Sequence, residues 1–549
     1  MQGEYAYDQK EVNMKKTVIL LVVILTMPVV VYSQLQINWQ QCYGSMAPDY
    51  AYDIAETDGG YLVTGIAGTG GGEVDCFERI GGGWLIKIDD SGSLIWQKCF
   101  DHAHALRIIK TIGSPYYYLI GGTISEPYPN TYNLWVAKID TLGNIIWERI
   151  LGNNIGILGG DQYGEATADG GVIATAQIDS KGGDITHWHG GYDGWVIKLD
   201  SLGNTQWDQS IGSSQFEFIN GIIQTSDGGY LAGLYGTPSG IGGNVDCVVF
   251  SDPDSPDAIV FKMDSLGNHE WHKCYGGTRH DGIVRLLETE GGYLLAGFGS
   301  STDGDLEGCG WHEGWHNSRM PTLDVWLMKI DFAGNIIWQK CYGGSGSDSP
   351  VRIFQTSDGG FIVFSNTTSF DGDVVGNPSA GPTNPSIWIF KVDNIGNLLW
   401  QQCIGGASSE RVHGVAKLSD SKYVVAGEMY FSPSGDVNCS NFVSGSRQNY
   451  WVFGISDTTV NVQEIPLTEL NFRIYPNPAN SFIYIESNEL KNKHKIGMLN
   501  LLGETILEKE INFTRTYVDI TSLPQGVYIL KIMNSMNSVV SIQKIIINN

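Results

Sequence analysis

Three residues of the chain have the types and spacing of a metal site. Cys309, His312 and His316 follow one another at intervals of three and four residues, with Glu313 between the two histidines. Thiolate, imidazole and carboxylate groups are the usual ligands of zinc. The set lacks a fourth ligand of evident spacing, and a disulfide at Cys309 would remove its thiolate. A structural role is therefore favoured, and His312 and His316 are retained only as metal candidates.

Aromatic residues that could bind a sugar stand in two of the long loops. Trp311 and Trp315 lie in the same segment as the histidines, and Trp188 and Tyr192 lie in another, between His187 and Asp193. Aromatic planes beside carboxylate and amide groups suit the faces and hydroxyls of sugar rings. The same residues would also serve to pack the loops onto the body of the protein, and this alternative is favoured slightly.

Short acidic segments offer oxygen ligands for calcium at three further places, Asp303-Gly304-Asp305, Asp371-Gly372-Asp373 and Gly435-Asp436. None has the alternating ligands and terminal bidentate acid of a complete calcium loop. Turn formation explains them better, so no cofactor is expected. No nucleophile motif, phosphate-binding glycine loop or fixed carboxylate pair is recognisable, and no catalytic residue is assigned. The chain is more readily explained as a binding protein than as an enzyme.

The elements that would position these loops are repeated β-hairpins. The phrase WLMKID at Trp326 is followed by the turn Asp331 to Asn335 and by a second strand, Ile336 to Tyr342. The glycine of this turn suits a tight hairpin connection. The first strand recurs at Trp84, Trp135, Trp195, Ile259, Trp388 and Trp451, and the second around Trp39, Trp96, Trp147, Trp207, Trp271 and Trp400. Each strand thus occurs seven times.

Between successive hairpins lies another pair of strands, usually joined by Asp-Gly-Gly, as at Asp358 to Gly360. Each unit of about 60 residues then holds four strands, which we call a, b, c and d, the content of one β-propeller blade. The first copy of strand d opens the chain without a partner, and the last strand c, near Ser456, has no strand after it. We therefore expect an all-β, seven-bladed propeller over residues 34–457, closed by the N-terminal strand.

The nine cysteines fit this arrangement when they are paired within a blade. The expected disulfides are Cys76–Cys99, Cys247–Cys274, Cys309–Cys341 and, through ring closure, Cys42–Cys439, with Cys403 left over. Pairing each cysteine of strand d with the next loop downstream would leave three unpaired. Because the a–b and c–d turns are short and the b–c loops are long and variable, we expect ligands to bind on the face of the b–c loops.

The two ends of the chain indicate export. Lys15 and Lys16 precede an apolar run from Val18 to Val31, which is the layout of a signal peptide over residues 1–33, with Met14 as an alternative start. The formal charge of −26 argues against nucleic acid or an anionic membrane as a partner. Residues 458–470 suggest a polar linker, and residues 471–549 alternate apolar and polar positions, as in a small β-sandwich.

Two resemblances to known families follow from these motifs. The strand, Asp-x-x-Gly-Asn turn and Trp strand resemble the tryptophan-docking hairpin of quinoprotein-type propellers, and more closely the repeats of secreted Bacteroidota β-propeller proteins. No quinone or metal site of those enzymes has a counterpart here. Residues 471–549 resemble the type A C-terminal sorting domain of the type IX secretion system. The residues that carry this resemblance are Pro476, Asn477, Pro478, Gly503, Gly526, Tyr528 and Lys544.

The sorting-domain resemblance implies passage through the periplasm and across the outer membrane, with the type IX secretion machinery as a partner. From the sequence we expect a monomeric, secreted or surface-displayed binding protein whose ligand is a glycan or another surface protein. The alternative is a secreted hydrolase or lyase that acts on polysaccharide from the same scaffold. The sequence identifies neither the ligand nor whether the exported protein is released or anchored.

Overall fold

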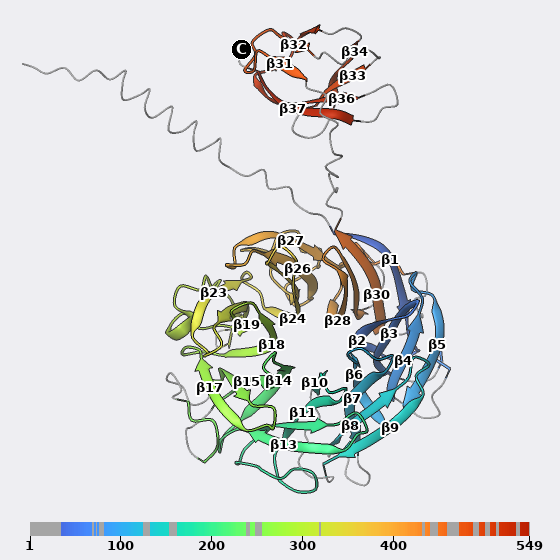
Figure 1. Cartoon of the computed structure of the whole chain (residues 1–549), viewed down its shortest axis with the longest axis vertical. Helices are drawn as coiled ribbons and strands as arrows, with labels where there is room; N and C mark the ends of the chain where they lie inside the picture. The colour runs from blue at the N-terminus through green and yellow to red at the C-terminus, as the bar shows by residue number, and fades with distance from the viewer. Residues whose placement is uncertain are drawn as a thin grey trace, which may run out of the picture. The chain divides into compact units, whose positions relative to one another are not determined.

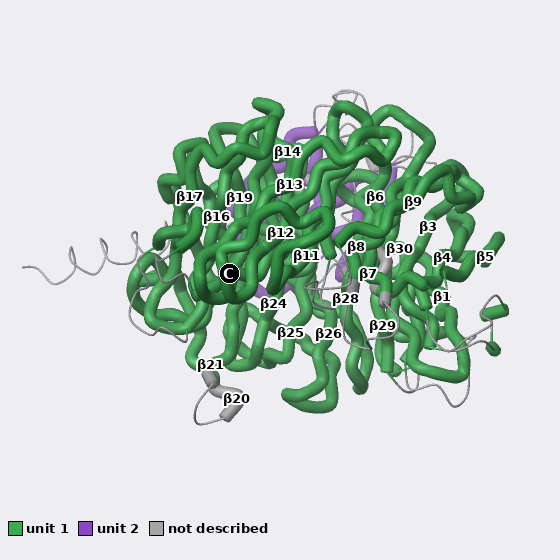
Figure 2. Tube along the Cα trace, turned by 90° about the horizontal axis from the view of Figure 1, so that it is seen from below, with its two compact units in different colours: residues 1–458 green, residues 459–549 purple. Residues whose placement is uncertain are grey.

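The computed structural model divides into two compact units, with the boundary between residues 458 and 459 (Figure 2). The expected signal peptide, 1–33, and linker, 458–470, lie outside the described residues. The structure describes residues 35–68, 71–72, 74–75, 82–100, 102–124, 132–152, 162–237, 242–247, 255–317, 320–430, 434–439, 448–457, 472–486, 494–499, 505–511, 515–533 and 539–547. No helix among these residues has the length and apolar character needed to cross a membrane.

Four-stranded antiparallel sheets make up the described part of the first unit, and there are seven of them. Sheets 1 to 4 are β2 (Tyr50–Thr57), β3 (Gly60–Ala67), β4 (Gly82–Ile88), β5 (Leu94–Phe100); β6 (Ala103–Lys110), β7 (Tyr117–Ile124), β8 (Tyr132–Ile139), β9 (Ile145–Leu151); β10 (Tyr163–Ala166), β11 (Val172–Ile178), β12 (Asp193–Leu199), β13 (Thr205–Ile211); and β14 (Glu217–Gln224), β15 (Tyr230–Gly236), β16 (Asp257–Met263), β17 (His269–Tyr275). Sheets 5 to 7 are β18 (Asp281–Thr289), β19 (Gly292–Gly299), β22 (Asp324–Ile330), β23 (Ile336–Tyr342); β24 (Asp348–Gln355), β25 (Phe361–Thr367), β26 (Ser386–Val392), β27 (Leu398–Ile404); and β28 (Glu410–Ser419), β29 (Lys422–Tyr430), β30 (Gln448–Asp457), β1 (Leu35–Tyr43).

The sheets are arranged around a common centre, which makes the unit propeller-like. In Figure 1 the first strand of each sheet lies nearest the central hollow and the last strand lies at the periphery. We call β2, β6, β10, β14, β18, β24 and β28 the inner strands. The connection between β19 and β22 also holds the short helix η1 (Gly304–Leu306) and the strand pair β20 (Trp315–Asn317) and β21 (Met320–Pro321).

The hairpin between the third and fourth strands owes its shape to an aspartate. In sheet 5 the side chain of Asp331 accepts hydrogen bonds from the backbone N–H groups of Ala333 (2.9 Å) and Asn335 (2.8 Å). Gly334 closes the turn with a φ of +82°, a conformation that side chains with a Cβ disfavour. β22, which precedes the turn, is buried along its whole length. The turn therefore returns the chain from a buried strand to a half-exposed one, β23.

The tryptophans of the repeat pack between sheets. Trp84, Trp135, Trp195, Trp326, Trp388 and Trp451, on the third strands, have no exposed surface. A buried indole N–H group needs a hydrogen-bond acceptor. For Trp326 this acceptor is Gln339 on the adjacent strand, because Nε1 of Trp326 donates to Oε1 of Gln339 at 3.0 Å. The same bond joins Trp84 to Gln97 and Trp388 to Gln401, both at 2.9 Å. These side chains form apolar layers with satisfied polar atoms.

The tryptophans of the outer strands contact the next sheet. A Cβ placed on Gly203, in the turn of sheet 3, would lie 2.9 Å from the indole of Trp147 in sheet 2. Equivalent contacts join Trp39 to Gly92, Trp96 to Gly143, Trp207 to Gly267, Trp271 to Gly334 and Trp338 to Gly396. The first of these joins β1, in sheet 7, to sheet 1. The glycine of the turn is thus needed for close approach of the neighbouring ring as well as for its backbone conformation.

The N-terminal strand β1 completes sheet 7. It pairs antiparallel with β30, with Gln41 opposite Val452. A disulfide joins Cys42 of β1 to Cys439, which precedes β30, at a sequence separation of 397 residues. The backbone N–H of Leu35 also donates to the side chain of Gln402 in sheet 6 at 2.8 Å. Strand pairing and a covalent bond therefore join the two ends of this unit.

Two further disulfides, Cys247–Cys274 and Cys309–Cys341, tie loops to outer strands. Cys403 is buried and free. Cys99 is disulfide-bonded, and Cys76, the partner expected from the sequence, lies outside the described residues. The disulfide at Cys309 means that its sulfur is not available as a thiolate ligand.

The second unit consists of two small sheets. One holds β31 (Arg473–Tyr475), β32 (Phe482–Glu486) and β35 (Arg515–Asp519), and the other holds β34 (Thr505–Ile511), β33 (His494–Leu499), β36 (Gly526–Met533) and β37 (Val539–Ile547). Apolar residues from both sheets, among them Ile483, Ile496, Leu530 and Ile545, form one buried cluster. The alternation of apolar and polar residues in the sequence thus corresponds to two sheets that share a core.

The contact between Gly203 and Trp147 predicts a measurable difference between two glycines with the same backbone conformation. Gly203 and Gly228 both have a φ of +85°, but no atom lies within 4 Å of a Cβ built on Gly228. Gly228→Ala should lower the free energy of unfolding by about 1 kcal/mol, the cost of a left-handed alanine. Gly203→Ala should cost about 1–3 kcal/mol more, because it also displaces an indole. Chemical denaturation measures both, and equal losses would contradict the packing role of the outer tryptophans.

The pairing of cysteines within one four-stranded unit predicts the disulfide partner of Cys76. Peptide mapping of the exported protein under non-reducing conditions should recover a peptide that links Cys76 to Cys99, as well as the three bonds described above. Cys403 should be recovered as a free thiol only after unfolding, because its side chain is buried. Recovery of Cys76 joined to Cys403, or as a free thiol, would show that the pairing within one unit is wrong.

Candidate functional site

The inner strands share an irregularity at the middle of the unit. Six of the seven are shifted in register against their second strands, which is the pattern of a β-bulge. The residues that directly follow the shift are Asp53, Arg107, Gly221, Arg285, Arg352 and Gly414. A bulge leaves a residue without its ladder partner and turns the local backbone. In the described inner strands, the bulges therefore release carbonyl groups from the hydrogen bonds of the sheet close to the centre of the unit.

Arginine side chains bind these freed carbonyl groups across the sheets. Nη1 of Arg107 donates to the carbonyl oxygen of Tyr52 in sheet 1 at 2.7 Å. Arg285 donates from Nε to the carbonyl oxygen of Val351 (2.6 Å) and from Nη1 to that of Asn220 (3.2 Å). Tyr52, Asn220 and Val351 each lie at the register shift of their own strand. The arginines thus satisfy backbone groups that the bulges expose and link neighbouring sheets.

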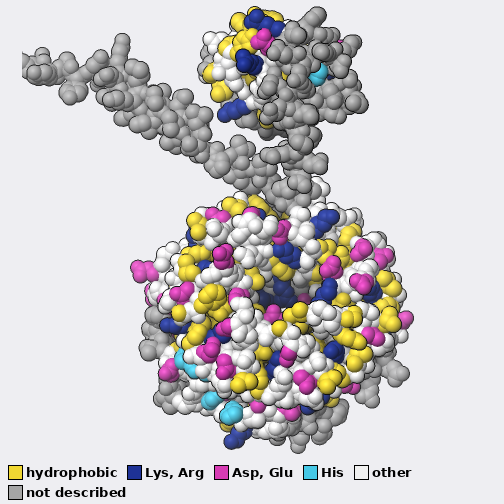
Figure 3. All heavy atoms as spheres, in the orientation of Figure 1, with side chains coloured by type: hydrophobic (Ala, Val, Ile, Leu, Met, Phe, Trp, Pro, Cys, Tyr) yellow, Lys and Arg dark blue, Asp and Glu magenta, His cyan; other side chains and the backbone are white. Residues whose placement is uncertain are grey.

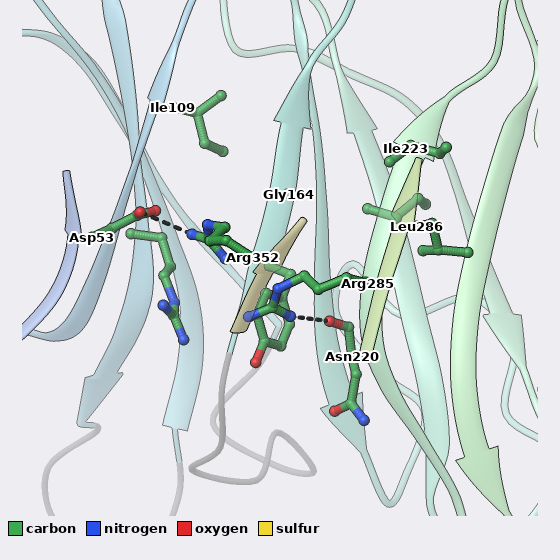
Figure 4. Close-up of a pocket in the computed structure, with 12 residues that line it drawn as sticks. Asp53, Ile109, Gly164, Asn220, Ile223, Arg285, Leu286 and Arg352 are labelled. Carbon is green, nitrogen blue, oxygen red and sulfur yellow. Dashed lines mark hydrogen bonds and ion pairs between the residues drawn. The ribbon is translucent and has the colours of Figure 1, made fainter. Parts of the chain in front are cut away.

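The same side chains line a cavity of about 130 Å³ at the centre of the unit (Figure 4). Nη2 of Arg352, from sheet 6, lies 2.8 Å from Oδ1 of Asp53, from sheet 1. The ring of Tyr163 on β10 lies between Arg107 and Arg285, whose guanidinium carbons are 5.1 and 4.8 Å from its centroid. Figure 3 shows Lys and Arg side chains gathered in the central hollow. Six different sheets contribute residues to this one site.

The cavity carries an excess of positive charge. Its lining holds three arginines and one aspartate, Asp53, so the balance is three minus one, or +2. The pKa of Arg285 is lowered to about 10. Burial is the main cause, and the nearby charges of Arg352 and Arg107 also lower this pKa. Arg285 is therefore still charged at neutral pH. The cavity therefore has an electropositive lining.

The sequence analysis missed this site, although a signal was present. The charged residues stand four positions before a buried threonine at the end of the inner strand or directly after it, as Asp53 does before Thr57, Arg107 before Thr111 and Arg285 before Thr289. An alignment of the inner strands on that threonine places these charged residues in one column.

The predicted sugar-binding residues of the first loop lie before β12. Trp188 is 38% exposed, and its Nε1 donates to the carbonyl oxygen of Gly191 at 3.3 Å. Tyr192 packs against Phe216 and Phe218, with ring centroids 5.1 and 6.0 Å apart. These two predicted residues lie in the same loop, but neither lines the central cavity.

The predicted residues of the second loop lie between β19 and β22. Trp311 packs against the core of sheet 5 and lies under the guanidinium of Arg279, 5.1 Å from its ring. Trp315 and His316 belong to β20, and their side chains are outside the described part of the structure. Nδ1 of His312 is 3.0 Å from Oδ2 of Asp324. No group of three or more His, Cys, Asp or Glu side chains among the described residues is placed to hold a metal ion.

Asp324 belongs to a buried pair of carboxyl groups where sheets 5 and 6 meet. Asp324 and Asp348 are both fully buried, and their carboxylates flank Gly343. Asp348 accepts hydrogen bonds from the N–H of Gly344 (3.0 Å) and the hydroxyl of Ser369 (2.7 Å). Burial raises the pKa of Asp348 to about 7, and the Asp324 carboxylate raises it too. The arrangement recurs at Asp193, Glu217 and His189, whose Nδ1 is 2.9 Å from Oδ2 of Asp193.

The sorting-signal residues cluster in the second unit. Asn477 donates from Nδ2 to the carbonyl oxygen of Lys544 (2.7 Å) and accepts from the N–H of Ile546 (2.8 Å). The Tyr528 hydroxyl donates to the carbonyl oxygen of Pro524 at 2.7 Å, and Gly526 begins β36. Pro476 and Pro478 flank Asn477, whereas Gly503 lies outside the described residues. The YPNP segment is thus held against the last strand.

Residues 473–548 match the secretion system C-terminal sorting domain. This domain directs type IX secretion, so the protein is exported to the cell surface or the extracellular space and interacts with the type IX machinery. The match covers the second unit and does not extend to the first. No curated protein matches the chain significantly.

Solved structures similar to the chain are distant. They include an α-L-arabinanase of Penicillium chrysogenum complexed with arabinobiose (TM-score 0.36, 10% identity, 63% of this chain and 92% of the enzyme) and the endosialidase of phage phi92 (TM-score 0.38, 10% identity, 94% and 87%). The plexin A4 extracellular region is a third (TM-score 0.43, 8% identity, 92% and 68%). Similarity at this level indicates neither a ligand nor an activity.

The buried carboxyl pair predicts how stability depends on pH. Since folded Asp348 holds its proton more tightly than unfolded Asp348, its protonation stabilises the fold at low pH, and this stabilisation is lost as the pH rises through about 7. Between pH 5 and 7 the loss should reach about 2 kcal/mol of the free energy of unfolding.

Asp348→Asn carries no charge at either pH, so it should reduce the difference in unfolding free energy between pH 5 and pH 7 by that amount. Denaturant titrations at both pH values provide the measurement, with Asp90→Asn, a change at an exposed turn residue, as the control. An undiminished pH dependence in Asp348→Asn would show that Asp348 is already ionised in the fold.

Proposed function

We propose that the exported protein is a closed, seven-bladed β-propeller that binds a small anionic ligand in its central cavity. The observation that carries this proposal is the convergence of three arginines on a cavity of about 130 Å³ in a chain of net charge −26. Guanidinium groups match the planar, bidentate geometry of a carboxylate or similar oxyanion. An anion there would offset the excess charge that the lining residues leave.

Closure of the ring is supported by the pairing of β1 with β30 and by the docking of Trp39 on Gly92. A closed ring matters for the site, because the cavity is assembled from six sheets and changes shape if any one of them moves. Ligand binding in the cavity is proposed beside the expectation from the sequence that ligands bind on the face of the b–c loops.

Two features of the arginines favour a ligand over a purely structural role. The freed carbonyl groups of Tyr52, Val351 and Asn220 are neutral and could be satisfied by neutral donors, whereas the guanidinium groups also bring positive charge to the site. In addition, Arg352 and Arg107 destabilise the charge of Arg285, and a scaffold would avoid such repulsion. Clusters of like charge with shifted pKa values are typical of functional sites.

Calorimetric titration of the exported full-length chain with sodium acetate and with sodium phosphate tests the proposal. Wild type should bind at least one of these anions saturably, and Arg285→Gln should weaken that binding at least tenfold. Arg411→Gln is the matched control, because Arg411 is half exposed and does not line the cavity.

Loss of binding must be separated from loss of folding, since Arg285 also bonds the backbone carbonyl groups of Val351, Asn220 and Val284. Arg107→Gln, which removes the bond to the carbonyl group of Tyr52, should weaken binding as well, and thermal unfolding reports whether each variant is folded. No saturable binding by folded wild type, or equal binding by all variants, would refute the proposal. Conversion of a polysaccharide to smaller products by the same protein would favour the alternative, an exported hydrolase or lyase.

A further inference from the structure

A row of partly exposed aromatic rings lies beside the arginine cavity. The rings of Phe218 and Tyr235 are stacked, with centroids 5.2 Å apart and planes inclined by 15°. Tyr235 contacts Phe298 edge to face at 5.7 Å, and Tyr192 continues the row on the other side of Phe218. The row crosses sheets 3, 4 and 5. Aromatic rings that are neither fully buried nor isolated form a platform for an apolar face of a ligand.

Two inner strands connect this row to the cavity. Phe218 stands two residues before Asn220 on β14, and the carbonyl of Asn220 binds Arg285. On β18, Gly282 stands three residues before Arg285 itself. Two or three residues of extended chain span about 7–10 Å, and this is the distance along the backbone between the aromatic row and the residues that line the cavity.

Gly282 is the residue that lets the rings converge. A Cβ on Gly282 would lie 2.6 Å from Cζ of Phe298 and 2.8 Å from Cβ of Tyr235. Any larger residue would push these rings apart. The side chains from sheets 4 and 5 therefore meet directly over the strand that carries Arg285, on the side where the inner strands begin.

We infer that the ligand is a sugar that carries a carboxylate, with its ring on the aromatic row and its carboxylate in the arginine cavity. This inference rests on the proposed function and adds the chemical class of the ligand. A pyranose offers an apolar C–H face to aromatic rings, and a carboxylate at its edge suits bidentate binding by guanidinium.

The charge of the protein selects among acidic sugars. A surface of net charge −26 repels a polymer with a carboxylate on every unit, whereas a single charge is drawn to the local excess of +2 in the cavity. The ligand is therefore an acidic monosaccharide or a glycan that ends in one, and not a polyuronate.

Titration of the full-length chain with sodium glucuronate, glucose and acetate tests this inference. Wild type should bind glucuronate at least tenfold more tightly than acetate, and glucose more weakly than glucuronate. The double variant Phe218→Ala and Phe298→Ala should lose most of the preference for glucuronate over acetate while it keeps its affinity for acetate. Phe332→Ala, at an exposed turn, is the matched control and should bind like wild type.

The outcomes separate the two proposals. Retained acetate binding by the double variant shows that its cavity is folded, so a lost preference supports the sugar inference. Equal affinity of wild type for acetate and glucuronate, or a preference unchanged by the double substitution, would overturn the sugar inference and leave anion binding intact. Absence of binding for both acetate and glucuronate would overturn the sugar inference, and absence of phosphate binding as well would overturn both proposals. Binding of polygalacturonate more tightly than glucuronate would overturn the limit to a single terminal charge.

Discussion

The packing of an outer-strand tryptophan on a turn glycine is the contact on which the arrangement of the sheets depends. Each sheet is a short antiparallel unit that cannot bury both of its faces alone. Trp147 reaches beyond its own sheet and fills the space that the missing side chain of Gly203 leaves in the next one. The turn aspartate holds that glycine in place, and the buried tryptophans of the third strands fill the layer beneath. One short sequence phrase thus specifies a turn, a strand pair and the orientation of the neighbouring sheet.

Because the contacts between tryptophan and glycine join the sheets at the periphery, the inner strands crowd together at the centre of the unit. The inner strands respond with bulges, which bend them but remove some carbonyl groups from the ladder. Water or a side chain must satisfy those groups, and Arg285 does so for Val351 and Asn220. The positive charge of the cavity thus comes from side chains that also satisfy backbone carbonyl groups. Three arginines and one aspartate leave an excess of positive charge in the lining, and this excess is the basis of the proposal that an anion binds there.

The sequence predicted the repeated hairpins, their turns and the sorting domain well, because each depends on short-range patterns. The turn at Asp331 to Asn335 is fixed by residues within five positions of one another. The arginine cavity could not be predicted in the same way, because Asp53 and Arg352 are 299 residues apart and meet only through the curvature of the whole unit. The pairing of carboxyl groups at Asp324 and Asp348 was hidden for a related reason, since each belongs to a different sheet. Tyr192 was predicted as an aromatic residue of a long loop, and its contacts with Phe216 and Phe218 could not be read from the sequence, because these residues lie in the first strand of the next sheet or directly before it.

The contrast between an acidic exterior and a cationic centre has a consequence for how a ligand reaches the site. At physiological salt, charges on the surface act over about 8 Å, so an approaching anion meets local repulsion near acidic loops and no long-range attraction. Inside the cavity, where solvent is reduced, the guanidinium groups act more strongly on whatever has entered. Under the proposed function, such a site discriminates by the size of the ligand and by the number of its charges. The sorting domain is a separate compact unit with its own core, so the means of export places no constraint on the residues that line the cavity.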